Sequence, residues 1–215
     1  FFPILYKIGL FFLFKKKKKI LFSTSLLKKI IPKKKISRCI FDFQIIYYTQ
    51  LVQNKKITKQ KNIDLIYYNR NHLSKKNKVI LDVIKVISKK FNVIVVGDFL
   101  KEKNIKNLKI INKKKLNQLL DKAKFTFSAP ENVISMFTLE CLSSQTKVFY
   151  DKKQSIISKF FSSNNLIPFN SNDFNKTLNI VDKHMNKKFY FNKTVLREKF
   201  WNKKLKSFNE FFLDC

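Results

Sequence analysis

The chain has 215 residues, of which 46 are Lys or Arg and 14 are Asp or Glu, so its formal net charge is +32. Apolar residues make up 45% of it, which allows a sizeable core and excludes a wholly disordered protein. Only three basic residues are arginine, Arg38, Arg70 and Arg197. Proteins selected to contact nucleic acids normally use more arginine. The many Lys, Asn, Ile and Phe residues are instead typical of an AT-rich coding sequence, although the charge still favours contact with anionic surfaces.

The cysteines Cys39, Cys141 and Cys215 and the two histidines show no metal-binding spacing, so no metal site is expected. Few and scattered cysteines favour a reducing, cytoplasmic compartment. The first 14 residues, FFPILYKIGLFFLF, are apolar and precede a lysine run. They are short for a membrane-spanning helix, and their charge order is the reverse of a signal peptide. Two interpretations remain, a buried element of a truncated preceding domain, which we favour, or a segment lying on a membrane.

Strand-like apolar runs alternate with helical patterns from Ile63 onwards. Strands are predicted at 63–68, 92–98, 108–111, 125–128, 147–151 and 166–169. Helices are predicted at 78–91, 114–124, 133–144, 154–163, 171–185 and 194–212, with Ser171 or Asn172 capping the helix at 171–185. This alternation predicts an α/β fold, a Rossmann-like and mainly parallel sheet with helices on both faces. We expect residues 1–60 to be the remnant of an N-terminal domain plus a linker, 61–192 the ligand-binding domain, and 193–215 a C-terminal helix.

Ligands of such sheets bind beyond the carboxyl ends of the strands. Arg70 follows the first strand of the alternating part, and Lys75 lies five residues later, near a predicted helix start. Two cations beside a helix N-terminus are suited to holding phosphate. A lysine near any loop is expected in this chain, so Arg70 carries most of the argument. His72 in the same loop is expected to be an exposed residue.

A second strand end is the stretch SAPENVISMFTLEC, residues 128–141. Glu131 and Asn132 stand where a helix-start acid and an N-cap are favoured. Glu140 is different, because it lies in an apolar run beside Cys141, which we expect to be a small core residue. A carboxylate there needs donors, either a pair of ligand hydroxyl groups or the ammonium group of a lysine.

Together these features resemble the C-terminal, donor-binding half of GT-B glycosyltransferases of the family 4-like group, over about residues 60–212. The resemblance implies that Arg70 and Lys75 hold the diphosphate and that Glu140 binds the ribose of a nucleotide sugar. Further implied contacts with the sugar, phosphate or base come from Glu131, Asn132, Ser135 and Gly97. The pattern departs from the family where Asn132 replaces a glutamate and Ser135 a common glycine. Its EN…FTLE stretch is also similar to fucosyltransferase-like GT-B enzymes.

The resemblance implies a hexosyltransferase-type glycosyltransferase that uses a nucleotide-diphosphate sugar as donor and needs neither metal nor cofactor. It further implies a glycan or lipid-linked acceptor, a role in cell envelope polysaccharide biosynthesis, and an N-terminal half required for activity. We expect a cytoplasmic protein with peripheral contact to an anionic membrane. Two alternatives stay open: a basic RNA-binding or ribosome-associated protein, and a catalytically inactive GT-B-like module. Nucleic acid is the less expected partner, because the aromatic residues fall in apolar runs rather than among the basic ones.

Overall fold

The structure is a computed structural model in which the chain divides into two compact units, Phe1–Leu51 with Glu198–Cys215, and Val52–Arg197. The residues that it describes are 20–22, 31, 33–34, 39–41, 60–70, 77–128, 136–154, 161–162, 164–190 and 195–196. In the first unit, β1 (Ile20–Phe22) and β2 (Cys39–Phe41) pair in parallel. The domain boundaries expected from the sequence remain predictions.

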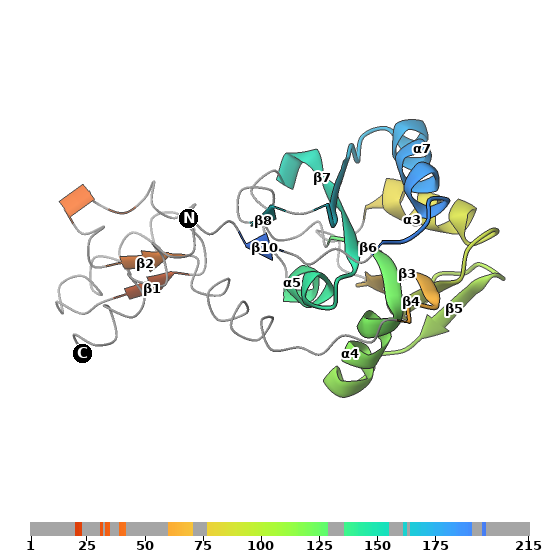
Figure 1. Cartoon of the computed structure of the whole chain (residues 1–215), viewed down its shortest axis with the longest axis horizontal. Coiled ribbons are helices and arrows are strands. Elements are labelled where there is room, and N and C mark those ends of the chain that lie inside the picture. Colours follow the sequence, from red (N-terminus) through yellow and green to blue (C-terminus); the bar gives the residue numbers. More distant parts are fainter. Residues whose placement is uncertain are drawn as a thin grey trace, which may run out of the picture. The chain divides into compact units, whose positions relative to one another are not determined.

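A six-stranded parallel sheet forms the centre of the second unit (Figure 1). Its strands are β3 (Ile63–Asn69), β4 (Val93–Gly97), β5 (Ile105–Leu108), β6 (Ala123–Phe127), β7 (Lys147–Asp151) and β9 (Leu166–Phe169). They lie in the order β5-β4-β3-β6-β7-β9, and each neighbouring pair is parallel. The chain order reverses at β3, which makes the sheet doubly wound. The predicted Rossmann-like α/β fold class is confirmed.

Helices pack on both faces of this sheet, α3 with α7 on one face and α4 with α5 on the other (Figure 1). Their bounds are Lys78–Ile87 for α3, Lys113–Lys122 for α4, Met136–Ser143 for α5 and Phe174–Met185 for α7. Successive side chains of a strand point to opposite faces. Leu65 and Tyr67 of β3 therefore join the core under α3 and α7, whereas the ring of Tyr68 stacks on Phe137 of α5. This alternation brings a strand-end aromatic ring to the helix that carries Glu140.

Aromatic rings fill the core beneath α3 and α7. The ring of Phe127 is fully buried and lies 5.2 Å from that of Phe149, 5.6 Å from that of Phe169 and 6.2 Å from that of Tyr67, centroid to centroid. Edge-to-face and tilted pairs of this kind add to the stabilisation that area burial provides. These four aromatic residues of the strands therefore serve the core, as expected.

A buried lysine ties the amino ends of the sheet together. The ammonium group of Lys61 donates hydrogen bonds to the carbonyl oxygen of Ala123 at 2.6 Å and to that of Ser144 at 2.8 Å. The hydroxyl of Thr146 lies 3.3 Å from the same nitrogen. Because one side chain satisfies acceptors at the start of β6 and in the turn after α5, it fixes α5 relative to the sheet.

The predicted strand at 108–111 is wrong by three residues, because β5 is Ile105–Leu108. Ile105 is the buried residue of this strand, and Asn107 holds it to the preceding loop by bonding both backbone groups of Leu100. The apolar run that suggested a later strand leaves the sheet instead, and Ile110 is 86% exposed.

Two predicted helices contain strand residues. In place of the helix at 154–163, the structure has a 3-10 turn (Lys152–Gln154) and β8 (Phe161–Ser162). β8 pairs antiparallel with β10 (Val195–Leu196), at the start of the helix predicted at 194–212. Short apolar runs fit either element, and here strand pairing prevails. The rest of these two segments lies outside the described residues.

The predicted cap of the helix at 171–185 is also wrong. Asp173 is the N-cap of α7, because its carboxylate accepts the backbone N–H of Lys176. The helix therefore starts at Phe174, later than the sequence pattern indicated.

Candidate ligand-binding site

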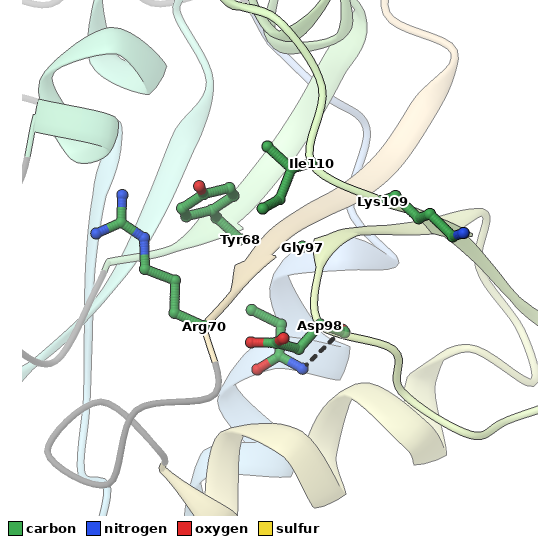
Figure 2. A pocket seen from close by; sticks show the side chains of 7 residues that line it. Tyr68, Arg70, Gly97, Asp98, Lys109 and Ile110 are labelled. Atoms are coloured by element: carbon green, nitrogen blue, oxygen red, sulfur yellow. Dashed lines mark hydrogen bonds between the residues drawn. The ribbon is translucent and has the colours of Figure 1, made fainter.

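A cavity of about 630 Å³ opens at the carboxyl ends of β3 and β4, beside the loop that follows β5. Pockets of this size hold nucleotide-sized ligands. Figure 2 shows the lining residues, which are Tyr68, Asn69, Arg70, Gly97, Asp98, Lys109 and Ile110. The lining thus combines cations, one carboxylate, an amide and apolar walls at the edge of the sheet where doubly wound folds bind their ligands.

Gly97 shapes the floor of this cavity. Its φ angle is +102°, a conformation that side-chain-bearing residues rarely adopt. A Cβ atom there would lie 2.2 Å from the carbonyl oxygen of Asn69. The same oxygen accepts the N–H of Asp98 at 2.9 Å, and the Asn69 amide donates back to the Asp98 carbonyl at 3.0 Å. Gly97 is therefore needed for the close junction of β3 and β4, and this junction fixes the backbone of Asp98 at the cavity.

Arg70 begins the loop after β3, and its guanidinium group lies on the ring of Tyr68, with 4.8 Å from the guanidinium carbon to the ring centroid. Figure 2 shows the two side chains next to each other. The Tyr68 ring also stacks on Phe137, with centroids 5.6 Å apart and an interplanar angle of 27°. The guanidinium group is thus held at the carboxyl end of β3, as the sequence argument for Arg70 requires.

Lys109 and Ile110 contribute the wall on the β5 side. Both are exposed, because β5 ends at Leu108 and the chain turns towards α4. In Figure 2 the Lys109 side chain extends away from Arg70, and Ile110 lies near the Tyr68 ring. The apolar side chain of Ile110 gives this wall a surface suited to a flat, weakly polar group.

Glu140 lies on α5, one helical turn beyond Phe137. Its side chain is 11% exposed, and its carboxylate pairs with the ammonium group of Lys113 in the first turn of α4. The lysine partner that the sequence left open as one alternative is therefore present. Among the described residues, the seven that line the cavity do not include Glu140.

The remaining residues implied by the resemblance cannot be placed. Lys75, Glu131, Asn132 and Ser135 lie outside the described residues, so their roles stay predictions. Sequence reasoning in turn missed several residues that line the cavity, Tyr68, Asn69, Asp98, Lys109 and Ile110. The strand-end rule contained the signal for Asn69 and Asp98, whereas Lys109 and Ile110 were hidden by the misplaced strand.

The chain is similar in structure to a UDP-forming α,α-trehalose-phosphate synthase from Burkholderia xenovorans, at 9% identity and a TM-score of 0.47, covering 69% of this chain and 43% of that one. It is also similar to the E. coli heptosyltransferase WaaC with ADP-2-deoxy-2-fluoro heptose, at 11% identity and a TM-score of 0.41, covering 64% and 46%. The chain thus spans less than half the length of these proteins, and identities this low concern the fold alone. No protein-family model matches the sequence. No curated protein matches it either.

In the part of the chain that the structure describes, every helix is too short or too polar to cross a bilayer.

Proposed function

We propose that this cavity binds a nucleotide-diphosphate sugar and that the chain is the donor-binding part of a GT-B glycosyltransferase. The observation that carries the proposal is the position of Arg70, an arginine at the carboxyl end of β3 in a cavity that also offers an apolar wall and a carboxylate. Of these contacts, the arginine suits a diphosphate and the apolar wall suits a base.

In this proposal Arg70 donates charge-assisted hydrogen bonds to the diphosphate. Sugar transfer breaks the bond between the anomeric carbon and a diphosphate oxygen and forms a bond from that carbon to an acceptor hydroxyl oxygen, which loses its proton. Negative charge grows on the departing diphosphate during this step. A guanidinium group fixed in advance stabilises that charge without having to reorganise, which is electrostatic catalysis.

The ribose is assigned to Glu140, and this assignment requires an exchange. A carboxylate can accept two hydrogen bonds from neighbouring hydroxyl groups, but the structure holds Lys113 against it. Since the Lys113 side chain is 58% exposed, its ammonium group can return to water when the ribose arrives. A glycan or lipid-linked acceptor, a hexose donor and a role at the membrane surface are further parts of the proposal.

Calorimetric titration of the full chain with UDP, GDP and ADP tests the proposal. We expect one of these nucleotides to bind and Arg70→Ala to weaken its binding by about 10- to 100-fold, the range for a hydrogen bond to a charged group. Lys89→Ala, which removes an exposed charge outside the cavity, is the matched control and should leave the affinity unchanged. Absence of nucleotide binding, together with tight binding of RNA oligonucleotides at physiological salt, would instead support the RNA-binding alternative.

A further inference from the structure

The guanidinium group of Arg70 lies over the ring of Tyr68, 4.8 Å from its centroid. That ring stacks on the ring of Phe137, with centroids 5.6 Å apart and an interplanar angle of 27°. Tyr68 is the penultimate residue of β3, and Phe137 belongs to the first turn of α5. These two contacts of Tyr68 therefore join a strand end, a helix start and the cation at the cavity.

Stacking of this kind changes what an arginine can do. An exposed arginine samples many rotamers, and ordering it when a ligand binds costs affinity. A guanidinium group that lies over an aromatic ring can still donate hydrogen bonds to a phosphate through its N–H groups. Tyr68 is in turn held by Phe137 and by the buried part of β3, so the support is rigid where Arg70 itself is exposed.

We propose that Tyr68 is a positioning residue that orders Arg70 for the diphosphate and that Phe137 supports it. The inference rests on the proposed function, because it assigns to Arg70 the anionic part of the ligand. The aromatic ring is the acting group, since the guanidinium carbon lies over the ring itself. Replacement by phenylalanine should therefore preserve the effect, and replacement by leucine should remove it.

Two ligands that differ only in the diphosphate give the test, UDP and uridine. In the full chain we expect Tyr68→Leu to weaken UDP binding about three- to tenfold, the equivalent of one cation–π contact, and uridine binding less than twofold. Tyr68→Phe should stay within about twofold of the wild type for both ligands. Phe137→Leu, which leaves the guanidinium–tyrosine pair in place, should weaken UDP binding less than Tyr68→Leu does. Tyr190→Leu, which removes an exposed tyrosine outside the cavity, is the matched control.

The double variant Arg70→Ala/Tyr68→Leu separates positioning from direct contact. If Tyr68 acts through Arg70, the double variant binds UDP no more weakly than Arg70→Ala alone. Equal losses for UDP and uridine in Tyr68→Leu would overturn the inference, because they indicate that the ring itself contacts the base. Unchanged UDP binding in Tyr68→Leu, with a loss in Arg70→Ala, would overturn the inference and leave the proposed function intact. Unchanged binding in Arg70→Ala would contradict the proposed function as well. Urea unfolding of each variant shows whether it is folded.

Discussion

The ammonium group of Lys113, at the start of α4, is paired with the carboxylate of Glu140 on α5. The pair joins a largely exposed side chain to a largely buried one. It also occupies the group that we assign to the ribose, so the lysine and the ligand compete for the same carboxylate.

Glu140→Gln should therefore reduce the preference for ribose hydroxyl groups. We expect this variant to bind UDP about tenfold more weakly, because an amide loses the charge that strengthens a hydrogen bond. The affinity for 2′,3′-dideoxy-UDP, which lacks the hydroxyl pair, should be nearly the same in this variant as in the wild type. Asp98→Asn provides the contrast, since Asp98 is the carboxylate that lines the cavity. If Asp98→Asn removes the preference for UDP over 2′,3′-dideoxy-UDP and Glu140→Gln does not, the assignment of the ribose to Glu140 is wrong.

Gly97→Ala should destabilise the second unit strongly. The new Cβ atom would meet the carbonyl oxygen of Asn69 at 2.2 Å, in a backbone conformation that already disfavours alanine. We expect the free energy of unfolding to fall by at least about 2 kcal/mol in urea titrations. Lys101→Ala, an exposed change in the loop that follows, should stay within about 0.5 kcal/mol of the wild type. A Gly97→Ala protein of normal stability would show that β3 and β4 can separate without cost.

Lys61→Met should lower stability although it places an apolar side chain in a buried site. The ammonium group satisfies the carbonyl oxygens of Ala123 and Ser144, and methionine leaves these acceptors without that donor. We expect a loss of about 1.5–3 kcal/mol in the free energy of unfolding with an unchanged denaturant slope. Lys89→Met on the surface is the control. Equal stabilities of the two variants would mean that Lys61 contributes only its hydrocarbon chain.

The pKa of His184 lies below its ordinary value, because burial disfavours the imidazolium form and Lys187, Lys147 and Lys183 repel it. In the pH range between the lowered value and the ordinary one, near 6.5, the unfolded chain binds more protons than the folded one. Stability contributed by this residue is therefore complete above about pH 6.5 and is lost as the pH falls. Unfolding titrations between pH 5 and 7.5 should show a weaker pH dependence for His184→Gln than for the wild type or His72→Gln. If the free energy of unfolding depended on pH equally in His184→Gln and the wild type, the lowered pKa of His184 would be contradicted.

Much of the sheet was predictable from the sequence, because its strands are buried on both faces and appear as continuous apolar runs such as VIVVG at 93–97. The position of strand β5 was not predictable, since Leu108 at its end and Ile110 in the loop beyond it are as apolar as its buried first residue, Ile105. Its pairing with β4 and the contact between Asn107 and Leu100 show where the strand lies. Local pattern therefore identified the elements, and contacts with other parts of the chain decided the bounds of β5.

The site was predictable only where a residue was rare in the sequence. Arg70 stood out because arginine is scarce, and it does line the cavity. Glu140 stood out as a carboxylate in an apolar run, but lysines are so frequent that its partner Lys113 could not be chosen among them. Tyr68 gave no signal, because an aromatic residue in a strand is ordinarily part of the core. The role that we propose for it follows from the face of β3 on which it lies.

The central claim, a nucleoside diphosphate in the cavity beside Arg70, can be tested directly at Gly97. The chain contains only two glycines, so protein labelled with ¹⁵N-glycine gives two backbone signals, and a Gly9→Ala variant identifies that of Gly97. We predict that UDP, or whichever nucleoside diphosphate binds in calorimetry, shifts the Gly97 signal with the same midpoint. Arg70→Ala should move that midpoint to higher nucleotide concentration. A Gly97 signal that stays in place while the nucleotide saturates the protein would contradict the claim.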